Sequence, residues 1–143
     1  RGAVLLTYGA RMPPVVRSYL DETQPSQRFA LGGPAAAADP TATAIAGVDR
    51  YDTAVRVAGR FFPDAESVAI ASGHAFPDAL AAGPVAAREA PPSPLLLIDS
   101  NVVPGVVEDY LRARREQLQV AVVFGGPAVV REERIGEIEA AIL

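Results

Sequence analysis

The 143-residue chain contains no cysteine, no lysine and no tryptophan, and its only histidine is His74. Without cysteine there is no disulfide, no thiolate nucleophile and no cysteine-based metal site. Without lysine there is no Walker A loop, because that loop places a lysine on the phosphates. A zinc site would have to combine His74 with carboxylates alone, which is an uncommon ligand set. These absences exclude many catalytic and metal-binding classes.

Charge and hydropathy argue against two further classes of partner. The net charge of −4 is unfavourable for an electrostatic grip on nucleic acid or on an anionic membrane. No apolar run approaches the ~18 residues that a membrane-spanning helix needs. The Gly-Gly-Pro turns lack the third glycine of the dinucleotide fingerprint. We therefore expect no nucleic-acid partner, no membrane insertion and no bound cofactor.

An internal repeat organises the chain. Residues 3–20 align with residues 94–111, and residues 28–36 align with residues 121–129. The segment between them, residues 45–93, occurs once. We call residues 1–44 and 94–143 the two B halves and residues 45–93 segment A, so that the chain reads B-A-B.

Each B half predicts a strand, a helix and a second strand, the latter at 28–31 and at 120–124. The apolar runs at 4–6 and 95–98 are too short for helices and suit buried parallel strands. The helix after each run carries apolar residues at i, i+1, i+4 and i+5, which form one stripe. The stripe residues are Val15, Val16, Tyr19 and Leu20 in the first B half and Val106, Val107, Tyr110 and Leu111 in the second.

Segment A predicts a further alternation of strands and helices: a strand near 44–46, a helix over about 50–62, a strand at 67–72 and a helix over 77–89. The chain closes with a helix in which Ile135, Ile138 and Ile142 share a face. This alternation favours a doubly wound, mostly parallel α/β sheet of the Rossmann or flavodoxin-like three-layer type. Right-handed crossovers would place helices on both faces.

In such sheets, ligands meet the loops at the carboxyl ends of the strands. Asp49 directly precedes a helix and suits its N-cap. Arg50 is harder to explain, because a cation at a helix N-terminus is unfavourable. We therefore expect Arg50 to have a partner, either a carboxylate such as Asp78 or Asp99, or a bound anion.

The loop at 72–78 contains residues that suit either a structural or a functional role. Phe76 fits either a core position, which we favour, or a platform for a sugar ring, and His74 is expected to be an exposed loop residue. Ser72 and His74 are too close in sequence to form a catalytic pair readily. The loop carboxylates Asp49, Asp78 and Asp99 leave glycoside cleavage open.

Four stretches in order carry a family resemblance: "IAGVDRYDTAVRVA" (45–58), "ASGHAFPDALAAGPVAA" (71–87), "PLLLID" (94–99) and "VVFGGPAVV" (122–130). They resemble the bacterial cell wall-binding repeat 2 family. By this resemblance, residues 45–143 are one complete repeat unit. Residues 1–44 are the second half of a preceding unit, packed on the same sheet or on a neighbour.

The resemblance implies a secreted, non-catalytic module at the cell wall or surface of a Gram-positive bacterium. Such modules anchor surface proteins to anionic or carbohydrate wall polymers, commonly as three tandem copies. One and a half copies indicate either a fragment of a longer protein, or assembly with further copies in cis or as a homo-oligomer. The polymer-binding candidates are Asp49, Arg50, Tyr51, Ser72, Gly73, Phe76, Asp78, Gly125 and Gly126. A self-assembly scaffold without polymer contact and a carboxylate hydrolase remain the alternatives.

Overall fold

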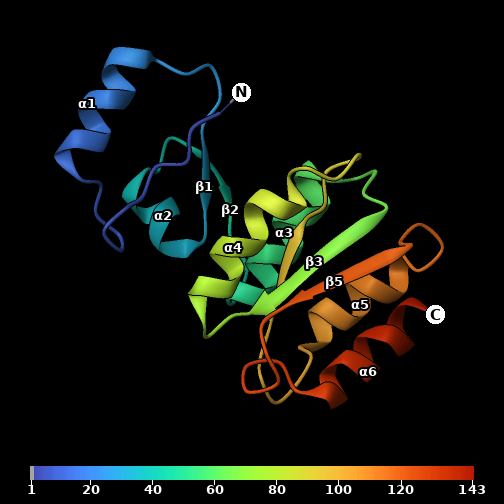
Figure 1. The fold of residues 1–143 in the computed structure, drawn as a ribbon. Coiled ribbons are helices and arrows are strands. Elements are labelled where there is room, and N and C mark those ends of the chain that lie inside the picture. Colours follow the sequence, from blue (N-terminus) through green and yellow to red (C-terminus); the bar gives the residue numbers. More distant parts are fainter. Residues whose placement is uncertain (1) are drawn as a thin grey trace. The chain divides into compact units, whose positions relative to one another are not determined.

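Parallel strands form two small sheets, one in each of two units of the chain (Figure 1). The computed structural model describes residues 2–143, and the units are Arg1–Asp49 and Arg50–Leu143. All strand pairs within the sheets are parallel, which confirms the predicted α/β class. The expected strands are divided between two sheets rather than joined in one.

The first unit is a small parallel strand pair with two helices. Arg28, directly before the first strand, pairs with Asp39 at 3.1 Å and donates a hydrogen bond to Thr41 at 2.7 Å, both in the segment before the second strand. Ala30 and Ile45 are the buried apolar residues of the pair. The elements are α1 (Pro14–Thr23), β1 (Phe29–Leu31), α2 (Gly33–Ala38) and β2 (Thr43–Ile45).

The strand predicted at residues 4–6 is wrong. Residues 2–7 form neither strand nor helix, and Val4, Leu5 and Leu6 are exposed. The apolar run has strand character but no strand beside it, and an unpaired strand leaves its backbone groups without partners. Pairing with a neighbouring strand, rather than apolar composition, therefore determined whether this run forms a strand.

The second unit holds the three-stranded sheet, in the order β4-β3-β5. Strand β3 is central, with Ile70 opposite Leu96 on one side and Val123 on the other. The predicted strands at 67–72, 95–98 and 120–124 and the closing helix are confirmed. The elements are α3 (Arg50–Phe61), β3 (Ser67–Ser72), α4 (Phe76–Ala86), β4 (Leu95–Ile98), α5 (Gly105–Ala113), β5 (Val120–Phe124) and α6 (Glu132–Ile142).

Alternation along β3 divides this unit into three layers. Val68 and Ile70 belong to the main core, which α3, α5 and α6 share. The intervening Ala69 and Ala71 are also buried, and α4 contacts all three strands through a separate set of small residues that includes Ala82. Figure 1 shows α4 on one side of the sheet and α5 and α6 on the other, and α3 packs against α5. The predicted helices on both faces are therefore confirmed for this unit.

The two repeated helices differ in burial. Helices α1 and α5 begin at aligned positions, Pro14 and Gly105. Val107, Tyr110 and Leu111 of α5 are buried in the main core, whereas α1 has no buried residue. The apolar stripe predicted for α5 is thus a core face, whereas the stripe predicted for α1 holds no buried residue.

None of the helices described in residues 2–143 has the length and apolar character needed to cross a membrane. The boundary between repeat units at residues 44 and 45 stays a prediction.

Candidate functional site

Loops at the carboxyl ends of β3 and β4 meet the first turn of α3. The N–H of Gly73, just after β3, donates to the carbonyl of Ile98, the last residue of β4, at 2.8 Å. This bond fixes the start of the loop relative to the neighbouring strand. We call the residues that gather here the strand-end cluster: Arg50, Tyr51, Gly73, His74 and Asp99.

Gly73 lets the first turn of α3 approach the loop closely. A Cβ atom at residue 73 would lie 2.7 Å from Cε1 of Tyr51 and 3.1 Å from Cδ of Arg50. Carbon atoms ordinarily pack at about 3.5–4.0 Å, so any side chain here would displace the tyrosine ring. The glycine is needed for packing rather than for an unusual backbone angle.

Arg50 is held by a backbone oxygen. Its Nη1 donates a short hydrogen bond to the carbonyl of Gly73. The carboxylate partner predicted for Arg50 is wrong: among residues 2–143 no ion pair involves Arg50, and Asp99 pairs with His74 instead. The reason lies in the close approach at Gly73, which brings a carbonyl within reach of the guanidinium. Arg50 is exposed, so its positive charge faces solvent.

His74 joins the two strand ends. Its Nε2 lies 2.7 Å from Oδ2 of Asp99 and 3.3 Å from the hydroxyl of Tyr51. An ionised carboxylate only accepts, so Nε2 carries the proton and donates to Asp99. The other carboxylate oxygen of Asp99 accepts the N–H of Asn101 at 2.8 Å. The Asn101 N–H and the His74 side chain together lower the pKa of the Asp99 carboxyl below its ordinary value.

We expect the Asp99→Asn variant to be less stable than the wild type at neutral pH. Because the pKa of Asp99 is depressed in the fold, its contribution is complete above the unfolded value of about 3.9. That contribution is lost as the pH falls through the lower, folded value. Denaturant unfolding of both proteins between pH 3 and pH 7 measures the difference, which should shrink below about pH 4. Parallel stability curves down to pH 3 would contradict the assignment.

The other candidate residues lie around the cluster. Ser72 is buried, and its Oγ accepts the N–H groups of His74 and Ala75 at 3.1 and 3.4 Å. It therefore fixes the turn before α4. Asp78 is in the first turn of α4, and its carboxylate would be 3.0 Å from a Cβ at Gly125. Gly125 has φ +125°, which an L side chain rarely adopts, and Gly126 beside it is exposed.

Phe76 does not occupy a core position. Its side chain is 72% exposed at the start of α4, which contradicts the favoured reading. Small residues of α4 such as Ala82 fill the space against the sheet, so this face has no room for an aromatic ring. Asp49 ends the first unit and directly precedes α3, and its capping role stays a prediction.

His74 and Asp99 were missing from the predicted site. A usable signal existed, because both residues follow neighbouring parallel strands and strand ends meet at one edge of a sheet. Arg134 of α6 was also missed. It donates a short hydrogen bond to the carbonyl of Asn101 and pairs with Glu137 at 2.8 Å, so α6 braces the loop that holds Asp99.

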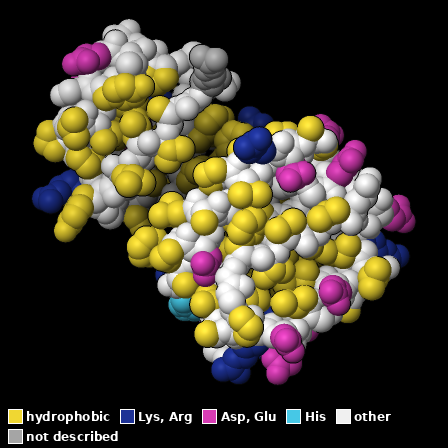
Figure 2. All heavy atoms as spheres, in the orientation of Figure 1, with side chains coloured by type: hydrophobic (Ala, Val, Ile, Leu, Met, Phe, Trp, Pro, Cys, Tyr) yellow, Lys and Arg dark blue, Asp and Glu magenta, His cyan; other side chains and the backbone are white. Residues whose placement is uncertain are grey.

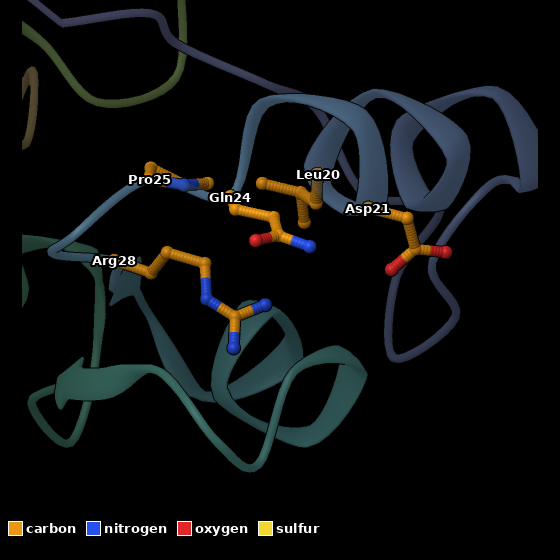
Figure 3. Close-up of a pocket in the computed structure, with 5 residues that line it drawn as sticks. All are labelled: Leu20, Asp21, Gln24, Pro25 and Arg28. Carbon is orange, nitrogen blue, oxygen red and sulfur yellow. The ribbon is translucent and has the colours of Figure 1, made fainter.

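Two open pockets are lined by other residues. One is in the first unit, at the end of α1 (Figure 3), and its lining residues are Leu20, Asp21, Gln24, Pro25 and Arg28. The other surrounds the end of α5, residues 112–117. Neither contains a residue of the strand-end cluster. Within residues 2–143 no group of histidine and carboxylate side chains is arranged to hold a metal ion.

Together, the duplicated strand–helix pattern and the parallel sheets define a repeat-built α/β module. The family model of cell wall binding domain 2 (CWB2) matches residues 44–135, and the chain belongs to this family. The family description names a binding domain and associates the chain with the cell wall.

Two known proteins are similar to this chain, one in sequence and one in structure. The chain is 27% identical over 107 residues to the N-acetylmuramoyl-L-alanine amidase LytC of Bacillus subtilis (strain 168). That match covers 75% of this chain and 21% of LytC. The structure of Cwp6 from Clostridium difficile superposes with a TM-score of 0.72 at 23% identity, over 92% of this chain and 22% of Cwp6. The likeness to Cwp6 confirms the fold. This chain spans about a fifth of the length of each relative.

Proposed function

We propose that the chain is a non-catalytic module that binds an anionic or carbohydrate polymer of the bacterial cell wall at the strand-end cluster. Arg50 carries the proposal. Its guanidinium is exposed, is held in place by the Gly73 carbonyl, and has no ion-pair partner among residues 2–143. A fixed guanidinium whose charge is not neutralised is suited to a carboxylate or phosphate of a polymer.

Neighbouring groups supply contacts of the kind that sugars need. The Phe76 ring is exposed, and an aromatic ring offers a rigid apolar face to a sugar ring. The exposed turn at Gly125 and Gly126 offers backbone groups that a ligand can approach closely. Because the net charge of the chain is −4, we ascribe affinity to this local arrangement rather than to a broad basic surface.

Replacing Arg50 by alanine should weaken binding to purified wall polymer by about tenfold or more, since charge-assisted hydrogen bonds are the strong ones. Co-sedimentation with the polymer, at several salt concentrations, measures the loss. Arg56→Ala is the matched control, because Arg56 lies on the same helix and is already paired with Asp52 at 2.9 Å. Equal binding by wild type and Arg50→Ala would remove Arg50 from the site. No binding by the wild type would refute the proposed function.

The proposal extends to cellular context. We propose that the module is secreted and holds a surface protein at the wall, with further copies of the repeat in cis or as a homo-oligomer. The scaffold alternative, in which repeats pack on one another and the polymer contact lies elsewhere, gains support from the exposed apolar face of α1. A mass measurement in solution, repeated with polymer present, separates self-assembly from polymer-driven association.

The hydrolase alternative has less support. Both oxygens of Asp99 accept hydrogen bonds, from His74 and from Asn101. Asp78 lies against the turn at Gly125. These two carboxylates are engaged within the loops themselves, and their contacts do not favour an acid–base pair that acts on a substrate.

A further inference from the structure

We infer that His74 is a second polymer contact beside Arg50, and that it strengthens the binding of an anionic polymer as the pH falls below neutral. The inference rests on the function proposed for the strand-end cluster and adds to it a pH dependence. It concerns one histidine whose ring is held at the edge where Arg50 faces solvent.

One peptide unit holds both side chains in place. The oxygen of the peptide between Gly73 and His74 accepts the hydrogen bond from Arg50. The N–H of the same peptide donates to Oγ of Ser72 at 3.1 Å, and Ser72 is a buried residue of β3, so the peptide is anchored to the sheet. The guanidinium of Arg50 and the imidazole of His74 are therefore neighbours at one strand end.

The imidazole ring is fixed on one side and open on the other. Its Nε2 lies 2.7 Å from the Asp99 carboxylate and 3.3 Å from the Tyr51 hydroxyl. Its Nδ1 has no hydrogen-bond partner among residues 2–143, and 60% of the His74 side chain is exposed. Figure 2 shows the histidine side chain, in cyan, at the molecular surface. A ligand can therefore reach the Nδ1 edge of the ring.

Protonation changes what Nδ1 can do. In the neutral ring Nε2 carries the proton and Nδ1 only accepts, whereas both nitrogens of an imidazolium donate. An imidazole ordinarily gains its second proton near a pH of about 6.5. The Asn101 N–H and the His74 side chain lower the pKa of the Asp99 carboxyl, so this carboxylate stays ionised across that change and keeps hold of Nε2. Acidification therefore turns an oriented acceptor into an oriented, charged donor.

The charges around the ring determine the direction of the effect. While the imidazole is neutral, the charges of Arg50 and Asp99 cancel, and with the imidazolium the three groups carry a net positive charge. An anionic polymer is then held more tightly in acid, whereas an uncharged polysaccharide gains no attraction. The other titratable groups on the elements that meet here are Tyr51 of α3, Asp78 of α4, and Arg134 with its partner Glu137 of α6. Groups of these types ordinarily titrate well above or well below neutral pH.

The test measures binding of the full chain to poly(glycerol phosphate) at pH 5.5 and pH 7.5, at constant ionic strength. Each phosphodiester of this probe keeps one negative charge at both values, so a change in affinity reports on the protein. We expect affinity to be about tenfold higher at pH 5.5, which is the effect of one charge-assisted hydrogen bond. Polygalacturonate supplies carboxylates in place of phosphates, and the acid gain should appear with whichever polyanion binds. Uncharged dextran should show no gain, and a gain on dextran would overturn the inference.

The His74→Gln variant isolates the histidine. Its amide can still donate to Asp99 but gains no proton, so its affinity should be the same at the two pH values. His74 is the only histidine of the chain, and the variant keeps the terminal amino group, so an acid gain that survives the substitution would overturn the inference. Equal binding by the wild type at both pH values would also overturn it and would leave the proposed function standing. Binding of neither polyanion nor purified wall polymer at either pH would refute the proposed function, and the inference with it.

Discussion

The Leu111→Ala variant should lose about 2–5 kcal/mol of unfolding free energy in the second unit, the usual range for leucine deletions in a core. Leu111 is completely buried and lies in the main core with Ile70 and Leu96. Alanine would leave a cavity that rigid neighbours from the sheet and from α6 fill only in part. Such a loss is a large share of the stability of a small domain.

Leu20 is the matched position for that experiment, because it aligns with Leu111 and is only half-buried in α1. We expect Leu20→Ala to cost about 1 kcal/mol or less, as substitutions outside a core usually do. Exchange rates of the β3 amides report on the second unit separately, which avoids the assumption that two units unfold together. Equal losses for the two variants would contradict the difference in burial between the repeated helices.

The Gly73→Ala variant should lose about 1–3 kcal/mol and should also disturb the strand-end cluster, as overpacked sites do. The new Cβ would meet the Tyr51 ring at 2.7 Å and must push it away. Displacement of Tyr51 also shifts Arg50, its neighbour on α3, which holds the Gly73 carbonyl. The loss is measured by denaturant unfolding, and the disturbance by the NMR signals of the Tyr51 and His74 rings.

Gly126→Ala is the control for Gly73→Ala. No atom lies within 4 Å of a Cβ at residue 126, and its backbone angle is one that alanine can adopt. We expect its stability to stay within about 0.5 kcal/mol of the wild type. If Gly73→Ala behaves in the same way, the close contact with Tyr51 is not a constraint in solution.

Local sequence patterns were sufficient to predict most of the strands and helices of the second unit. The strand at 67–72 is uncharged, apolar and bounded by turn residues, and its partners at 95–98 and 120–124 share that character. For such segments the local strand preference of the sequence and the packing in the fold favour the same structure. The same reasoning was wrong at 4–6, where an equally apolar run has no neighbouring strand. Pairing is a long-range property that the run itself does not contain.

The candidate site could be predicted only in part. Strand order brings loops together, so the gathering of Arg50, Gly73 and Asp99 follows from the parallel sheet. Which side chains pair within it depends on distances of a few tenths of an ångström. Arg50 donates a hydrogen bond to the carbonyl of Gly73, and the Asp99 carboxylate, one of the partners expected for Arg50, pairs with His74 instead.

The central position of β3 also affects how the chain is made. Both strands that flank β3 come later in the sequence, so a chain emerging from the ribosome presents β3 with two bare edges. Strand β4 covers one edge after residue 98, and the other stays open until residues 120–124 are synthesised. Uncharged apolar strands with open edges promote aggregation. A translation product that stops before residue 120 should therefore depend on chaperones to stay soluble.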